Sequence, residues 1–151
     1  MTRICNSIEI RRPIDAVFEF ITTPANWPQW HPASVSVSEN GDHSLQPGEE
    51  VIEQIKVAGH RGEARWRVRE RIAPSRWVIE GTGNKGGRAT ITYTLTEESA
   101  GINFERELVY MMPNPLLAVM DWLFIRSRMK TDSAEALRRL KDRLESGGGS
   151  G

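Results

Sequence analysis

Two charged residues occupy positions at which the surrounding pattern predicts apolar side chains. Glu53 is in phase with Val51 and Ile55, and Arg106 alternates with Phe104 in the two-residue period of a strand. A charge that faces a protein interior is costly unless it is paired. An inward-facing Arg106 therefore predicts a carboxylate partner, Glu53 first, or an anionic ligand. A strand bulge that reverses the phase would place Arg106 in water instead, and the sequence leaves both alternatives open.

Two further polar residues lie in apolar surroundings. Asn6 interrupts an alternating apolar segment near the N-terminus, and Asp121 lies within the apolar segment 119–124. Either Asp121 is a pocket acid with a raised pKa, or it pairs with Arg126 or Arg128 nearby. The candidates for catalysis are Glu53, Arg106 and Asp121. No two of these residues have the fixed spacing that would identify a reaction.

Aromatic residues supply most of the other binding candidates, because 5 tryptophans are many for a chain of this length. Trp66 follows the small Ala64 on the same predicted face, which leaves room for a flat apolar molecule. Plain core packing is the alternative interpretation of such residues. The predicted ligand-binding residues are Trp30, Glu53, Trp66, Tyr93, Phe104, Arg106, Tyr110, Met120, Asp121 and Phe124.

Motifs associated with cofactors, metals or covalent catalysis lack the context that they need. Gly81–Gly86 matches the pattern G-x-G-x-x-G, but a strand follows it where a dinucleotide site needs a helix, so we interpret it as a hairpin loop. The histidines are His31, His43 and His60, and their spacing is not that of metal ligands on one element. Cys5 has no basic partner in phase on its strand. We therefore predict neither a metal nor a cofactor.

Composition and charge exclude several classes of partner. The chain has 151 residues, which suits one domain, and Lys+Arg and Asp+Glu both number 20. A net charge of zero predicts no surface for nucleic acid or an anionic membrane. No apolar run approaches the roughly 20 residues of a membrane-spanning helix, and a single cysteine favours a reducing cytoplasm. We expect a cytoplasmic monomer or weak homodimer whose partner is a small apolar or aromatic molecule.

The predicted order of elements is strand, helix, six strands and helix, in one domain over residues 1–146. The glycine-rich tail 147–151 is interpreted as a flexible linker, typical of an expressed or engineered chain. The closing helix is predicted to begin at Asn114-Pro115 and to end at Ser146-Gly147, with a kink or break near Thr131. Its apolar face is predicted to contain Leu116, Met120, Leu123, Leu137, Leu140 and Leu144.

Several short segments carry a resemblance to a known superfamily. They are Ile8–Ile10, Pro13–Phe18, Asn26–Pro32, Pro47–Gly48, Gly101–Phe104 and Ala136–Leu144. In these segments the chain resembles the START-like (SRPBCC) helix-grip superfamily, and within it the bacterial polyketide cyclase/dehydrase-like proteins. The resemblance implies an α+β fold, in which a curved antiparallel sheet of six or seven strands wraps around a long C-terminal helix, with one or two short helices after the first strand. It implies a scaffold and not a catalytic signature.

Two hypotheses of function follow. The first is a binding module that holds a small hydrophobic or aromatic ligand between the sheet and the closing helix. The alternative is an enzyme of cyclase, aldol or dehydratase type, which needs a positioned acid and base in the same pocket. Convergence of Glu53, Arg106 and a tyrosine on one point would favour the enzyme, and a wholly apolar interior would favour carriage of an apolar ligand. A protein-interaction domain is disfavoured by the neutral net charge.

Overall fold

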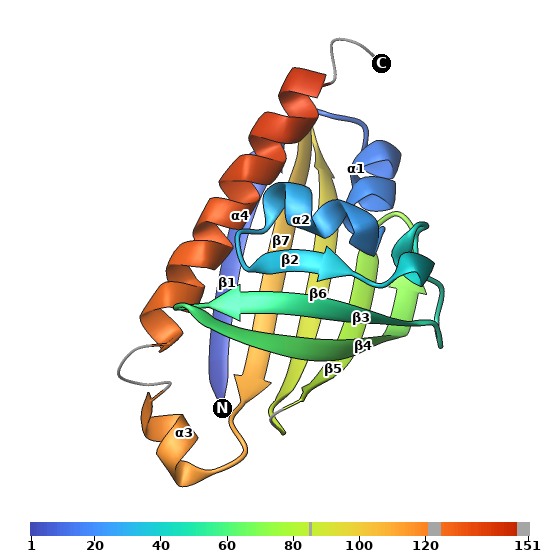
Figure 1. Cartoon of the computed structure of the whole chain (residues 1–151). Helices are drawn as coiled ribbons and strands as arrows, with labels where there is room; N and C mark the ends of the chain where they lie inside the picture. Colours follow the sequence, from blue (N-terminus) through green and yellow to red (C-terminus); the bar gives the residue numbers. More distant parts are fainter. Residues whose placement is uncertain (85, 121–124, 148–151) are drawn as a thin grey trace.

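The fold is built on one antiparallel sheet. A computed structural model describes residues 1–84, 86–120 and 125–147, and within them the sheet has 7 strands. The strands are β1 (Thr2–Ile10), β2 (Ser34–Val37), β3 (Glu50–Val57), β4 (His60–Ile72), β5 (Arg76–Gly83), β6 (Arg88–Glu98) and β7 (Gly101–Met111). Their order is β1-β7-β6-β5-β4-β3-β2, so the first strand pairs with the last. Figure 1 shows the sheet curling from β7 round to β3, as the sequence predicts.

Alternation along each strand gives the sheet an inner and an outer face. In β7 the side chains of Phe104, Arg106 and Leu108 are buried, whereas Glu105 between them is exposed. Side chains two residues apart point the same way in a strand, so Arg106 lies on the inner face with its apolar neighbours. The inward alternative for Arg106 is therefore confirmed, and no bulge reverses its phase.

Short helices after the first strand cover one end of this inner face. They are α1 (Ile14–Ile21), the 3-10 turn η1 (Pro24–Asn26) and α2 (Trp27–Trp30), and a second 3-10 turn, η2 (Glu39–Gly41), precedes β3. Val17, Phe18 and Ile21 are the buried residues of α1, at the spacing of one helical face. Because α1 contacts β6, this end of the interior is closed.

The long helix α4 (Arg126–Gly147) lies along the other side of the inner face. It packs mainly on β1 and α2. Ala136, Leu137 and Leu140 are buried, which confirms the predicted apolar stripe in this part of the helix. None of the described helices is long and apolar enough to span a membrane.

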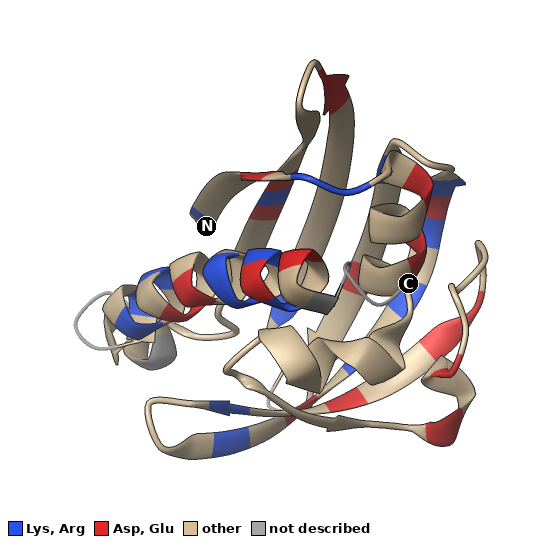
Figure 2. Ribbon diagram, turned by 90° about the horizontal axis from the view of Figure 1, so that it is seen from above, with Lys and Arg blue, Asp and Glu red and all other residues tan. Residues whose placement is uncertain are grey.

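Charges cover the opposite side of α4. They alternate along the helix in Figure 2, and i,i+4 pairs join Arg139 to Glu135 at 3.2 Å and Lys141 to Glu145 at 2.6 Å. Exposed pairs of this kind contribute only a few tenths of a kcal/mol each, roughly. The helix is therefore held in place by its apolar stripe and not by its surface charges.

The start of the C-terminal helix differs from the sequence-based expectation. A separate short helix, α3 (Pro115–Met120), precedes α4, while residues 121–124 lie outside the described part of the chain. The side chain of Leu116 is 71% exposed and that of Met120 is 39% exposed. Apolar spacing shows that a helix has an apolar face, but it does not show that another element covers that face. Of the kink or break expected near Thr131, the break is not found, because α4 continues through that residue.

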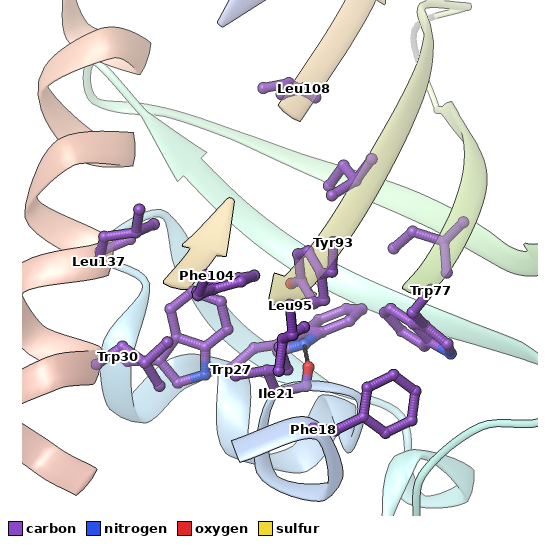
Figure 3. Close-up of a cluster of buried hydrophobic side chains, with 14 of the residues drawn as sticks. Phe18, Ile21, Trp27, Trp30, Trp77, Tyr93, Leu95, Phe104, Leu108 and Leu137 are labelled. Atoms are coloured by element: carbon purple, nitrogen blue, oxygen red, sulfur yellow. Dashed lines mark hydrogen bonds between the residues drawn. The ribbon is translucent and has the colours of Figure 1, made fainter. Parts of the chain in front are cut away.

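An aromatic cluster fills the closed end of the interior. Trp30 from α2, Tyr93 from β6 and Phe104 from β7 lie together, with the Tyr93 and Phe104 rings perpendicular at 5.1 Å. Trp77 joins them, 5.4 Å from Tyr93. Figure 3 shows these rings close together near α1 and α2, with Leu108 well apart from them. The closed end is therefore packed with side chains, and a candidate site is sought toward Leu108.

Candidate functional site

Strand register places three polar side chains in one row across the inner face. Arg106 on β7 lies opposite Asn6 on β1 and opposite Tyr93 on β6. Residues directly opposite each other in an antiparallel pair have neighbouring side chains on the same face. The row separates the aromatic cluster on one side from Leu108 and Ile91, which lie two residues further along the same strands.

Arg106 is a buried cation whose polar contacts are to two neutral hydroxyl groups, those of Tyr93 and Ser133. Its side chain is only 6% exposed, and its contact to α4 is a long one, with Nη1 donating to Ser133 Oγ at 3.4 Å. Its Nε is buried without a hydrogen-bond partner. Among the described residues, no salt bridge joins Arg106 to a carboxylate. The expected ion pair with Glu53 is therefore not formed.

Glu53 is the buried acid of the same interior, and its partner is an indole. Trp66 Nε1 donates to Glu53 Oε1 at 3.0 Å. Burial raises the pKa of Glu53, while the Ser34 hydroxyl, the Trp66 N–H and, last, the charge of Arg106 work in the opposite direction. A carboxyl group of this kind can keep its proton closer to neutral pH than an exposed acid does.

The indole of Trp66 has room because a glycine lies beside it. A Cβ at Gly81 would come within 2.4 Å of the six-membered ring of Trp66. Register continues this row through Gly81 and Ala89 to Tyr110. Two aromatic side chains are thus separated by two small residues on the inner face. We expected Gly81 in a hairpin loop, but it belongs to β5. Because it has no side chain, the Trp66 indole can lie directly against its backbone.

Burial differs only slightly along the interior. Trp77 and Phe104 at the closed end are 0% exposed, Val51 and Ile79 are 1% exposed, Leu108 and Trp66 are 6% exposed and Ile91 is 7% exposed. The buried charged residues Arg106 and Glu53 distinguish the region, and we take the interior between the row of Arg106 and the row of Trp66 as the candidate site.

Two titratable residues near Arg106 are held neutral. Burial raises the pKa of Tyr93 to about 12, against the opposing effect of the Arg106 charge. The pKa of His31 lies well below its usual range, first because of burial and then because of the charge of Arg106. Its Nδ1 accepts a hydrogen bond from the Ala33 backbone N–H at 3.1 Å, so the ring proton is on Nε2. Glu53, Tyr93 and Arg106 thus lie within electrostatic range of one another.

The other predicted site residues are distributed more widely. Trp30 and Phe104 belong to the packed aromatic cluster, Tyr110 is buried beside Ala89, and Met120 is on α3 away from the buried core. Asp121 and Phe124 lie outside the described residues. The sequence analysis missed Ser133, although it precedes Leu137 by four residues and so lies on the buried stripe of α4.

A surface hollow of about 490 Å³ lies mostly among outer-face side chains, although it also touches Gly81, Ala89 and Tyr110 at the end of the candidate site. Its lining includes Arg65, Arg67, Arg88 and Met111, and those side chains are exposed. It contains neither Arg106 nor Glu53, so we do not place the site there. Across the described residues, no group of three or more His, Cys, Asp or Glu side chains is arranged to hold a metal ion.

The fold and this interior define a helix-grip domain, and comparison of the sequence with known families agrees. Residues 1–145 match the family described as polyketide cyclase / dehydrase and lipid transport, and the chain belongs to that family. No curated protein matches the chain.

Solved structures support the same fold. A protein of Rhodobacter sphaeroides has a TM-score of 0.72 at 19% identity, covering 96% of this chain and 93% of its own. The di-domain ARO/CYC protein BexL of the BE-7585A biosynthetic pathway has a TM-score of 0.68 at 21% identity, covering 98% of this chain and 48% of its own. The Aha1 dimer of Colwellia psychrerythraea has a TM-score of 0.65 at 18% identity, covering 97% and 98%. Such low identities carry the fold and not the function.

Proposed function

We propose that this protein binds a small hydrophobic or aromatic ligand inside the fold, between the inner face of the sheet and α4. The observation that carries the proposal is a buried cation that has no salt bridge to any described residue. Arg106 Nε and, opposite it on β1, Asn6 Oδ1 are buried polar atoms that lack partners beside the apolar side chains of Leu108 and Ile91. Trp30 Nε1 in the closed end also lacks a partner, but it carries no charge. Buried polar atoms are normally satisfied, so their presence here supports a site that a ligand completes.

The chemistry of the lining supports the class of ligand. Trp66, Ile91 and Leu108 offer apolar surface, and Gly81 lets the Trp66 indole lie flat against β5. Ligand sites of this type combine mostly apolar walls with a few placed polar groups. The family description, which includes lipid transport, is consistent with carriage of an apolar molecule.

Intrinsic fluorescence provides the test. A panel of planar aromatic and aliphatic molecules is titrated into the wild type and into Trp66→Phe and Trp77→Phe variants. Trp77 is the matched control, because it is fully buried in the closed end. We expect ligands at micromolar concentration to change the emission of the wild type and of Trp77→Phe, and the change to disappear in Trp66→Phe. A change that persists in Trp66→Phe but disappears in Trp77→Phe, or no response to any member, would contradict the proposal.

Catalysis at the same site is the second candidate, and one observation favours it. Glu53, Tyr93 and Arg106 lie within electrostatic range of one another, as acid-base chemistry on an enolisable ligand requires. In such a step the Glu53 carboxylate removes a proton from the carbon beside a ketone. Arg106 then stabilises the enolate oxygen, and the same carboxyl group returns a proton to carbon. Cyclase, aldol and dehydratase reactions all begin with this step.

Hydrogen–deuterium exchange tests the catalytic candidate without knowledge of the substrate. The enolisable ketone 2-tetralone is incubated with the protein in D₂O, and loss of its α-proton signals is followed by NMR. We expect exchange faster than in buffer, and a reduction of about tenfold or more in Glu53→Gln. An exposed acid on the neighbouring strand, Glu63, provides the control substitution Glu63→Gln. Equal rates in all samples would leave ligand binding as the only function that the site supports.

A further inference from the structure

We propose that the ligand is a monoanion, a small apolar or aromatic carboxylate whose charged group binds to Arg106. This inference rests on the proposed function, because it assigns the chemistry of the ligand of the same interior site. It goes further in predicting that a neutral molecule of the same shape binds much more weakly.

The first step of the argument is charge balance. The guanidinium of Arg106 keeps its charge when buried, and a buried charge without a counter-ion is unfavourable. The buried carboxylic acids of the described residues are both engaged elsewhere. Glu53 accepts from the Trp66 indole, and Asp132 pairs with Arg128 at 3.3 Å. The positive charge of Arg106 is therefore available to a ligand.

The second step is geometry. A guanidinium binds a carboxylate through two parallel N–H groups, and such bonds are stronger than those between neutral groups. In Arg106 the Nε–H is buried and unused, while the rest of the guanidinium contacts only neutral hydroxyl groups, Ser133 Oγ at 3.4 Å from Nη1 and the Tyr93 hydroxyl. A carboxylate that approaches from the side of Leu108 and Ile91 would therefore find unused donor capacity.

The third step is size. From the row of Arg106 to the row of Tyr110 and Trp66 there are four residues of strand, or about 13 Å at ~3.3 Å per residue. A carboxylate held at Arg106 thus places an apolar body of bicyclic aromatic or medium-chain length along Leu108 and toward Trp66. In this arrangement the carboxylate lies at the row of Arg106, and the apolar body extends toward the row of Trp66 and Tyr110 on the same face of the sheet.

Calorimetric titrations of matched ligand pairs test the inference. The probes are 2-naphthoate and decanoate, each compared with its uncharged amide, and the proteins are the wild type, Arg106→Met and Arg106→Lys. We expect the wild type to bind each carboxylate about tenfold or more tightly than its amide. In Arg106→Met the carboxylate should lose this advantage while the amide binds as before. Arg106→Lys should keep part of the preference, because it retains the charge but not the fork geometry.

The outcomes separate this inference from the proposed function. If acids and amides bind the wild type equally, the inference is overturned and the proposed function stands. If neither acids nor amides bind, the proposed function fails as well. If Arg106→Met keeps the preference for the carboxylate, another residue binds the anion and the assignment to Arg106 is wrong. If Arg106→Met does not fold, the affinities of the wild type and of Arg106→Lys for acid and amide still show whether the ligand must carry a negative charge.

Discussion

At the scale of single residues, Glu53 and Arg106 share an interior without forming an ion pair. Glu53 is paired with a neutral indole, and Arg106 contacts the neutral hydroxyl groups of Ser133 and Tyr93. None of these partners cancels a charge. Each residue therefore keeps a property that a close salt bridge would remove. Glu53 holds its proton more tightly than an exposed acid does, and Arg106 keeps a positive charge that no carboxylate neutralises.

The raised pKa of Glu53 makes stability depend on pH in a defined direction. Because the folded protein binds this proton more tightly than the unfolded chain, the stability that it contributes is fully present below the pKa of the unfolded chain and is lost as pH rises through the folded pKa. Glu53→Gln removes this loss and can still accept from Trp66. We expect the free energy of unfolding of Glu53→Gln, relative to wild type, to increase between about pH 4 and about pH 8.

Urea unfolding at several pH values measures this difference. The control is Glu63→Gln, in which the acid replaced is exposed on the outer side of β4. A difference between Glu53→Gln and wild type that does not change with pH would show that the buried carboxyl group has no unusual proton affinity.

Gly81 should tolerate no side chain, for a reason that concerns the site. The Cβ of Gly81→Ala would lie 2.4 Å from the Trp66 ring, so the indole must move and its hydrogen bond to Glu53 must change. Overpacking of this kind costs about 1–3 kcal/mol. Gly83→Ala on the same strand is the control, because its Cβ would meet nothing closer than 3.9 Å.

Thermal unfolding and the Trp66 emission maximum together check this prediction. We expect Gly81→Ala to lower the melting temperature and shift the emission. If Gly81→Ala and Gly83→Ala behave alike, the indole does not lie against Gly81.

At the scale of elements, alternation and helical spacing predicted most of the sheet and the buried part of α4. Period-two patterns are local, and for Arg106 they left an inward position and a bulge as alternatives, of which the structure shows the inward one. The separate helix α3 could not be predicted, because its apolar residues have the same spacing as those of α4. Whether such a face is covered depends on the path of the chain in three dimensions. Contacts between strands, such as Trp66 with Glu53, likewise depend on register, which one sequence does not reveal.

Truncation of leucines distinguishes the two parts of the C-terminal region. Leu137→Ala and Leu140→Ala should each lower the free energy of unfolding by about 2–5 kcal/mol, as buried leucines do. Leu116→Ala, at a side chain that is 71% exposed, is the matched control and should change it by less than about 0.5 kcal/mol. Urea melts measure all three. A large loss in Leu116→Ala would show that α3 is packed against a partner in solution.

At the scale of the whole molecule, the closed end provides the stability and the region around Arg106 carries a stability cost. One sequence predicted that Arg106 and Glu53 are buried, but it could not predict that they would lie apart, since that distance is set by the curl of the sheet between β3 and β7. An ion pair with Glu53 that supported the fold would make Arg106→Met destabilising. The structure reverses that expectation, because the side chain removed is a buried cation that forms no salt bridge with any described residue.

Replacing a whole buried ion pair by well-packed apolar side chains is often neutral or stabilising by about 1–4 kcal/mol, and an unpaired buried cation lacks even the attraction of a partner. We therefore expect Arg106→Met to unfold at the same or a higher urea concentration than wild type, with an unchanged dependence on urea. Leu108→Ala, two residues along the same strand and equally buried, shows the loss that removal of ordinary core packing produces at this position. If Arg106→Met is destabilised as much as Leu108→Ala, then Arg106 supports the fold in the free protein. If Arg106→Met is at least as stable as wild type, the fold does not need Arg106. That result would support a role for Arg106 in binding.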